Sequence, residues 1–538
     1  MATKFGFSDF ESWLTTGGDD RSLILEETGA NKYHIKPRPI LSTQIFRGSC
    51  TGNPPTRTGY DAAKALYDDL LPHLHSHSHS HSHSHSHSHS QLRSKPQSSE
   101  ELDAALRNIF EQQRRRLAEY LELPPGTEII LCPSGSDAEY IPIAIARALH
   151  PNKKIVSGIT QLNEIGAGTA PASMGKYFST YAPFLGRVRV PEDDHDDDDD
   201  DDDEDAYLEG YDGIEGVVIH ARDKDGTAID ASEEMNIFTQ TQLALNNYPI
   251  VHGVFGGKTG MRDGNMPPSL GKGDESMGVV DACQGRFTLK ELEQWLGQDS
   301  IVLFTTSKFY QAPPFCGAVI LPASIASKVS QCEPPKDMLG KNGLLAFVTD
   351  KELPSCMDGW KEHLSDEQRN NVGLALRWEA GLAAMEKISF LSDEERTMLT
   401  DEWANMVKTM VDDHPCLEAF CVERSIISIR MAKDGNSAGG NWLSMSEARD
   451  LFRWMSLDVS EAVPGASEEE KEALSVSGFI GQPVSVSEDY AIVRIALGVE
   501  SLVAYSVDKD QTLGEDSLIV KKLGAISKYF SVLKESEL

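Results

Sequence analysis

The central part of the chain alternates short apolar runs with longer stretches of helical periodicity. Stretches with helical spacing cover 101–123 and 136–150, and the short apolar runs lie at 127–134, 152–159, 216–223, 248–256, 277–284 and 300–308. Continuous apolar strands that alternate with helices are typical of a mostly parallel sheet covered on both faces. The pattern therefore predicts an α/β fold class, with a large domain over 101–335.

The pattern changes after about residue 335. A long helix is expected over 364–388, strands over 416–433 and 488–502, and helices around 444–456 and 514–534. This order predicts a connecting helix and a smaller α+β C-terminal domain over 336–538. Residues 1–70 show no clear pattern, and we expect them to pack on the smaller domain or to line the site.

Two low-complexity segments interrupt the pattern. Residues 71–100 contain eight His-Ser pairs, and residues 191–206 contain a run with 13 acidic side chains. Neither segment can bury apolar surface, so both are predicted to be disordered insertions. Solvated loops are the simpler interpretation. The histidines can also bind transition metals, which leaves a non-enzymatic metal-binding protein as an alternative function.

The composition of the chain limits the kinds of molecule that it can bind and the compartment in which it is expected. The chain has 538 residues, enough for two or three domains, and a formal net charge of −34. Such a surface repels phosphate backbones, which argues against a nucleic-acid partner. The sequence contains no apolar window long enough to span a membrane and no targeting pattern at its start. The eight cysteines form no C-x-x-C pair, so we expect a cytoplasmic protein with reduced thiols.

The first candidate cluster is LCPSGSDAE, residues 131–139, where a strand turns into a helix. Gly135 allows close approach of the backbone to a ligand. The amides of Ser136 and Asp137 at the helix N-terminus are suited to binding a phosphate. Ser and Asp are also common helix N-caps, and that simpler interpretation stays open.

Two further clusters follow later strands. Asp281 follows Val279 and Val280 within the run 277–284, and a buried carboxylate there needs a partner such as a protonated ring nitrogen. Gln284 is placed to hydrogen-bond a ring hydroxyl. Lys308 ends the run 300–308, and burial of its amine lowers its pKa and makes it a nucleophile. Thr305 and Ser307 supply hydroxyls for a phosphate. An ordinary capping Asp and a structural Lys are the alternatives.

A phosphate cradle, an acid for a pyridinium nitrogen and a Schiff-base lysine are what pyridoxal 5′-phosphate needs. Over roughly residues 100–330 the chain resembles the fold type I pyridoxal-phosphate enzymes, in particular the class V aminotransferase and cysteine desulfurase branch. SGSDAE is similar to that branch's SGxTE loop, Asp281-Ala-Cys-Gln284 to its Asp-x-x-Gln, and Thr305-Thr-Ser-Lys308 to its Ser/Thr-x-His-Lys. The resemblance implies that Asp281 meets the ring nitrogen, that Lys308 bonds to the cofactor and moves protons, and that the protein is a homodimer.

The chain departs from this family at several positions. Ser307 stands where many relatives have His. Segment 160–178 has no aromatic residue before Tyr177 to stack on the cofactor ring, which keeps a member without turnover as an alternative. Cys316 and Cys356 are the nearest candidates for a desulfurase cysteine, although a buried structural cysteine is the more typical role.

Relatives hold the substrate carboxylate with an Arg near the end of the chain. Arg494 lies among apolar neighbours and needs an acidic partner, either that carboxylate or an internal salt bridge. Arg430 is the second choice and Arg47 the third. His220 and Arg222 follow another strand, where they face the cofactor or belong to the core.

These observations predict a pyridoxal-phosphate enzyme that acts on a small-molecule amino acid, with transamination first. Carbon–sulfur lysis or desulfuration is the runner-up, followed by decarboxylation. No metal site is expected at the reacting centre.

Overall fold

The computed structural model describes residues 6–75, 97–160, 162–188, 207–224, 226–259, 274–366, 368–435, 440–487 and 489–536. The His-Ser repeat beyond residue 75 and the whole of the acidic run lie outside the described residues. Residues 71–75 and 97–100 form the ends of two helices, so the predicted insertion is too wide at both sides. Within the described ranges, no helix is long and apolar enough to cross a membrane.

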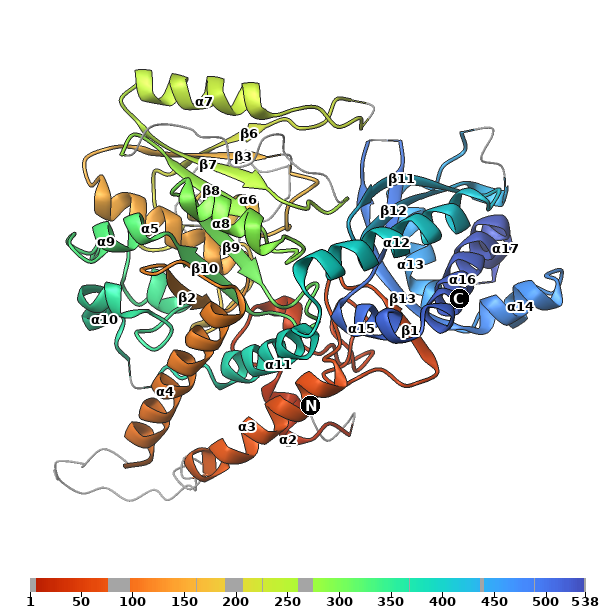
Figure 1. Ribbon diagram of the computed structural model, residues 1–538, viewed down its shortest axis with the longest axis horizontal. Coiled ribbons are helices and arrows are strands. Elements are labelled where there is room, and N and C mark those ends of the chain that lie inside the picture. Colours follow the sequence, from red (N-terminus) through yellow and green to blue (C-terminus); the bar gives the residue numbers. More distant parts are fainter. Residues whose placement is uncertain are drawn as a thin grey trace.

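A seven-stranded sheet forms the larger half of the molecule (Figure 1). Its spatial order is β2 (Glu128–Cys132), β10 (Gly317–Leu321), β9 (Ile301–Thr305), β8 (Met277–Asp281), β7 (Tyr248–Val254), β3 (Ile155–Thr160) and β6 (Glu215–Ile219). β10 is antiparallel to both of its neighbours, and the remaining pairings are parallel. The predicted mostly parallel α/β sheet is confirmed.

Helices cover both faces of this sheet because successive strand residues point to opposite sides. Val302 and Phe304 of β9 pack into one core with α4, α8 and α11, whereas Ile301 and Leu303 pack into another with α5 and α9. The helices of this half are α4 (Gln97–Tyr120), α5 (Tyr140–Leu149), α6 (Thr169–Ser173), α7 (Ser232–Ala244), α8 (Leu289–Gly297), α9 (Ala323–Val329) and α10 (Asp358–Leu364). The fully apolar strands of the sequence are therefore strands buried on both faces.

A five-stranded sheet lies on the other side of α11 (Val372–Ile388), as Figure 1 shows. Its order is β1 (Gln44–Arg47), β13 (Ser477–Ser485), β14 (Ala491–Ala496), β12 (Ile426–Met431) and β11 (Leu417–Glu423). β1 comes from the N-terminal segment and pairs in parallel with β13, and the other pairings are antiparallel. The remaining helices are α2 (Asp9–Trp13), α3 (Arg57–His75), α12 (Asp393–Asp412), α13 (Met445–Met455), α14 (Glu468–Ser475), α15 (Val499–Val507), α16 (Lys509–Lys528) and α17 (Phe530–Glu535).

Two predicted elements are wrong at their boundaries. The helix expected over 364–388 begins eight residues late, because α10 ends at Leu364 and α11 begins at Val372, where the Asn371 side chain accepts the N–H of Leu374 at 2.9 Å. The strand expected over 488–502 ends at Ala496. The chain then enters α15. A side chain from a distant segment caps its first turn: Gln311 Oε1 accepts the N–H of Glu500 at 2.8 Å. Both corrections depend on side-chain caps that hydrophobic periodicity does not report.

Candidate active site

The carboxyl ends of β2, β8 and β9 meet at one cavity of about 400 Å³. These three strands run in the same direction, so the residues that follow them gather at one edge of the sheet. The predicted residues that line the cavity are Gly135, Ser136, Asp281, Gln284, Thr305, Ser307, Lys308 and Arg494. The structure thus brings together the three clusters and Arg494, and Asp137 alone among the residues predicted to contact the cofactor does not line the cavity.

The Ser-Gly-Ser turn after β2 is packed against the ends of β8 and β9. A Cβ on Gly135 would lie 2.7 Å from Cys283 Sγ and 3.0 Å from Thr305 Cγ2, so neighbouring side chains already exclude a larger residue there. Ser136 occupies the N-cap position, but its side chain makes no capping hydrogen bond. Instead, Ser134 Oγ accepts the N–H of Asp137 at 3.1 Å.

Asp137 differs from the role predicted for it. Its carboxylate is fully buried, and neither oxygen has a hydrogen-bond partner among the described residues. Burial and the nearby Asp19 carboxylate raise its pKa to about 7. Its N–H, predicted to bind an anion, is already used by Ser134. The structure therefore gives no support to Asp137 as a cofactor contact.

Lys308 follows β9 and points into the cavity region with no acidic partner among the described residues. Its Nζ donates to the carbonyl oxygen of Thr51. Burial lowers the pKa of this amine to about 7, and the guanidinium of Arg21 contributes in the same direction. An amine with this pKa is largely available as the neutral, nucleophilic form near pH 7.

Asp281 and Gln284 are held in defined orientations at the end of β8. Asp281 Oδ1 accepts the N–H of Cys283 at 3.0 Å. Gln284 Oε1 accepts from Arg286 Nη1 at 2.9 Å, and Gln284 Nε2 donates to Cys50 O at 3.2 Å. Arg286 therefore fixes which end of the Gln284 amide donates. This orientation suits an acceptor oxygen in the cavity.

The hydroxyls of Thr305 and Ser307 are partly engaged with the protein itself. Thr305 Oγ1 donates to Cys283 O at 2.7 Å, and Ser307 Oγ donates to Thr305 Oγ1 at 3.4 Å. These bonds tie the end of β9 to the end of β8. Both residues line the cavity, and their role as hydroxyl donors to a phosphate stays a prediction.

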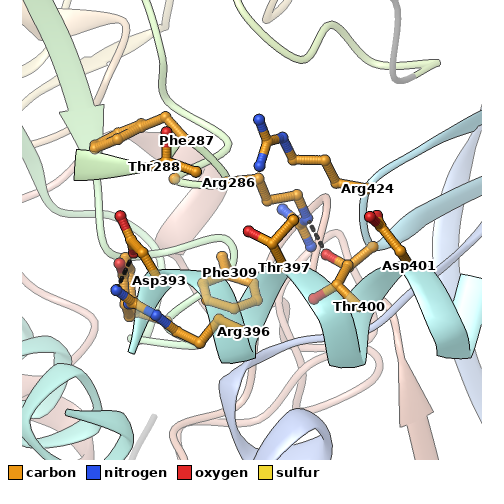
Figure 2. A pocket seen from close by; sticks show the side chains of 13 residues that line it. Arg286, Phe287, Thr288, Phe309, Asp393, Arg396, Thr397, Thr400, Asp401 and Arg424 are labelled. Atoms are coloured by element: carbon orange, nitrogen blue, oxygen red, sulfur yellow. Dashed lines mark hydrogen bonds and ion pairs between the residues drawn. The ribbon is translucent and has the colours of Figure 1, made fainter. Parts of the chain in front are cut away.

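Figure 2 shows a second, smaller pocket, which Arg286 lines together with Thr288, Arg396, Thr400 and Arg424 among others. Arg286 is buried there and donates to Ser425 Oγ at 2.7 Å. The pocket has a volume of about 40 Å³, room for one or two water molecules rather than a cofactor. The larger cavity is therefore the candidate active site. Arg286 contributes to it indirectly, by holding the side chain of Gln284.

Arg494, on β14, is 2% exposed and makes no contact with a carboxylate among the described residues. It donates to Lys258 O at 2.8 Å, to Gln482 O at 3.0 Å and to Thr51 Oγ1 at 3.1 Å. The internal salt bridge considered as the alternative is therefore absent from the part of the chain that the structure describes.

The other predicted arginines have internal acidic partners and do not line the cavity. Arg430 pairs with Glu418, and Arg47 pairs with Asp516 at 2.5 Å. Arg222 pairs with Glu164 at 2.7 Å. His220 is exposed, so it belongs neither to the core nor to the cavity.

Sequence reasoning missed Arg21, which comes from the N-terminal segment. Its guanidinium donates to Ser134 Oγ at 3.1 Å and to Ser136 Oγ at 3.4 Å, beside the predicted phosphate cradle. Burial opposes its charge, but the ion pair with Asp19 raises its pKa, so it stays protonated. No local pattern marks Arg21, because it lies in a stretch without periodicity.

The stacking residue expected in 160–178 is not aromatic in this structure. Ile165 lines the cavity and is 3% exposed. Tyr177 lies elsewhere, donating to Asn342 O at 2.9 Å and packing against Phe347. The other described residues of that segment that line the cavity are Glu164, Gly166, Ala167 and Thr169, and none of them is aromatic.

Neither a protein-family model nor a curated protein matches the chain. Among solved structures, mouse CSAD in apo form shares 13% identity and a TM-score of 0.51 over 89% of this chain and 84% of that one. Rhodiola rosea 4-hydroxyphenylacetaldehyde synthase shares 12% identity (TM-score 0.48; 90% and 83% covered), as does Escherichia coli cysteine desulfurase CsdA (TM-score 0.46; 89% and 96% covered). The likeness to mouse CSAD establishes the fold, and the predicted fold type I architecture is confirmed.

Proposed function

We propose that this chain is a pyridoxal-phosphate-dependent enzyme that acts on an amino acid, and that its reaction is transamination. One observation carries the proposal: a single cavity holds a half-buried lysine and a buried arginine, neither with a carboxylate partner in the described chain, together with Asp281. The seven-stranded sheet provides Asp281 at the end of β8 and Lys308 shortly after β9, and the five-stranded sheet provides Arg494 on β14.

The residues present fit the cofactor. The cavity's volume lies in the usual range for small-molecule sites. Lys308 would hold the cofactor covalently, Asp281 would face the ring nitrogen, and Gln284 would donate to the ring hydroxyl. The phosphate would lie at the Ser134–Ser136 turn, beside Arg21 and the hydroxyls of Thr305 and Ser307. When bound, this cofactor withdraws electrons from the substrate's α-carbon.

The protein's own groups then decide which bond breaks. Once the amino group of the substrate had displaced Lys308 from the cofactor, the freed neutral amine would remove the proton from the α-carbon and deliver it to the cofactor carbon that Lys308 had occupied. The guanidinium of Arg494 holds the α-carboxylate as an ion through charge-assisted hydrogen bonds. The guanidinium would thereby fix the direction of the bond between the α-carbon and the carboxylate, and we propose that this orientation leaves the Cα–H bond as the one that breaks. This favours transamination over decarboxylation.

The two cysteines considered for desulfuration do not support that reaction. Cys316 is fully buried at 2.8 Å from Thr306 Oγ1, and burial raises its pKa to about 11. Burial raises the pKa of Cys356 to about 12. Neither lines the cavity, and neither supplies a thiolate at neutral pH.

The remaining alternatives and the quaternary structure stay predictions. The His-Ser repeat of the metal-binding alternative lies almost wholly outside the described residues. Deletion of 75–90 tests this alternative: an enzyme should keep its turnover, whereas a metal-binding protein that uses the repeat should lose its function. Within the described ranges, no group of three or more His, Cys, Asp or Glu is arranged to hold a metal ion. The homodimer implied by the family resemblance is tested by the mass of the protein in solution.

The decisive experiment is the visible absorbance of the purified protein before and after borohydride, with peptide mapping of the reduced adduct. We expect a yellow protein whose cofactor is trapped on Lys308. The buried Lys522, whose pKa is also lowered to about 7, is an internal control that must stay unlabelled. An amino-acid screen for keto acid, sulfide and carbon dioxide then identifies the reaction. A protein that stays colourless with added cofactor would refute the proposal.

A further inference from the structure

The candidate cavity carries more positive charge than the cofactor and one carboxylate account for. Although the chain as a whole has a net charge of −34, basic residues outnumber acidic ones around the cavity. The basic lining residues are Arg21, Lys32, Lys258, Lys308 and Arg494. The acidic lining residues are Glu164 and Asp281, and Glu164 already pairs with Arg222 at 2.7 Å.

The proposed function, on which this inference rests, assigns a task to most of these cations. Arg21 adjoins the serines of the phosphate cradle, Lys308 bonds the cofactor, and Arg494 binds the α-carboxylate. Lys32 is an exposed residue at the rim. Lys258 is the cation left without a task.

The backbone of Lys258 is held on both sides by residues of the site. Its N–H donates to Glu164 O at 2.6 Å, and its carbonyl oxygen accepts from Arg494 Nη1 at 2.8 Å. Lys258 therefore stands directly beside the guanidinium expected to hold the substrate. A bound molecule that contacts Arg494 comes within reach of the Lys258 side chain.

The ammonium of Lys258 makes no hydrogen bond or ion pair with any described residue. Burial lowers its pKa to about 8, and repulsion by Arg494 adds to this effect. The nearby Glu164 carboxylate offsets this only in part, since it already pairs with Arg222. A half-buried charge beside a second cation is unfavourable unless an anion binds there. Two neighbouring cations, one of them free, form a binding site for a molecule with two acidic groups.

We propose that Lys258 binds a second acidic group of the substrate, so that the enzyme prefers amino acids whose side chain ends in a carboxylate or another oxyanion. Arg494 binds the α-carboxylate of such a substrate, and Lys258 binds the distal anion. A neutral side chain of the same shape would leave Lys258 buried and uncompensated.

The test uses the cofactor-loaded enzyme and matched substrate pairs: aspartate and asparagine, glutamate and glutamine, and O-phosphoserine and serine. Spectral titration gives Kd, and turnover gives kcat/KM. For at least one pair we expect the acidic member to be preferred by about 10- to 100-fold, the size of a charge-assisted hydrogen bond. The three pairs also distinguish a carboxylate from a phosphate.

Variants connect this preference to Lys258. Lys258→Gln should remove the preference mainly through KM, and Lys258→Arg should retain much of it. Lys336→Gln, which removes an exposed lysine that does not line the cavity, should change nothing. A loss of preference in the Lys336 variant would point to the overall charge instead and would overturn the inference.

The outcomes separate this inference from the proposed function. A loaded enzyme that turns over neutral and acidic members equally would overturn the inference and leave the proposed function intact. A Lys258→Gln variant that loses affinity for the cofactor, but not the acid preference, would assign Lys258 to the cofactor and also overturn it. Failure of the wild type to bind the cofactor would instead refute the proposed function.

Discussion

Arg47 and Arg494 lie on two strands of the same five-stranded sheet, each 2% exposed, yet their surroundings differ. Arg47 is enclosed by acids, with Asp516 at 2.5 Å and Glu515 at 3.1 Å. Arg494 meets only carbonyl and hydroxyl oxygens on the protein side and faces the large cavity. The fold thus provides internal carboxylates for Arg47, whereas the charge of Arg494 is available to an anionic ligand in the cavity.

A third buried arginine shows that the absence of a carboxylate partner does not by itself indicate a binding site. Arg377 is fully buried and donates to the carbonyl oxygens of Phe315 at 2.7 Å and Leu14 at 3.1 Å. It lines no large cavity, and burial lowers its pKa to about 10. A buried cation therefore indicates a binding site only where it also borders empty space of the right size.

Removal of the cavity's lysine should have the largest effect on function. Lys308→Ala should lower turnover by about 10³- to 10⁴-fold, because the covalent anchor and the proton-transfer group are both lost. Steady-state assays measure the rate, and circular dichroism checks the fold. Lys522→Met is the matched control, since it removes a buried lysine with a similar pKa outside the cavity. Turnover near the wild-type rate in the Lys308 variant would refute the mechanism.

The enclosed arginine should matter for stability rather than for catalysis. Arg47→Met leaves the carboxylate of Asp516 buried with only the Trp403 indole N–H as a donor at 2.8 Å among the described residues. We expect the free energy of unfolding to fall by about 3–5 kcal/mol, as when one partner of a buried ion pair is removed. Urea denaturation measures the loss. If the double variant with Asp516→Asn regained much of the lost stability, the unpaired carboxylate would be confirmed as the cause. An unchanged denaturation midpoint in Arg47→Met would contradict the prediction.

The cavity-facing arginine should show the opposite behaviour. Arg494→Lys should raise KM for the amino acid by about 10- to 100-fold, because a lysine cannot keep the contacts to Lys258 O, Gln482 O and Thr51 Oγ1 and also donate to the α-carboxylate. The cofactor spectrum should be unchanged. Arg430→Lys is the control, since Arg430 already pairs with Glu418. If Arg430→Lys raised KM and Arg494→Lys did not, the assignment of the two arginines would be reversed.

A smaller effect concerns pH. Burial lowers the pKa of Lys308 to about 7, and only its neutral amine reacts with the cofactor. Uptake of cofactor by the empty protein should therefore be fast above pH 7 and should slow by about tenfold for each unit below it. Stopped-flow absorbance from pH 5 to 9 measures this. A midpoint near pH 10 would mean that the amine is not desolvated.

Much of the site was predictable because it follows local rules. Gly135, Asp281, Gln284 and Lys308 each stand directly after an apolar run, and parallel strands bring their carboxyl ends together. Asp137 shows the limit of such reasoning, since its carboxylate is buried away from the cavity and its N–H is bound by Ser134. Arg21 and Lys258 were missed because no periodic segment contains them.

The sequence by itself determined the strands, their fully apolar character and the polar residues at their ends, since these depend on near neighbours along the chain. Only the tertiary structure decided which buried cations have internal acidic partners and which face open space. That distinction depends on contacts between distant segments: Arg47 pairs with Asp516 after β1 joins β13, and Arg494 binds Lys258 O across the two sheets. Charge compensation at long range is a property of packing, and no local pattern records it.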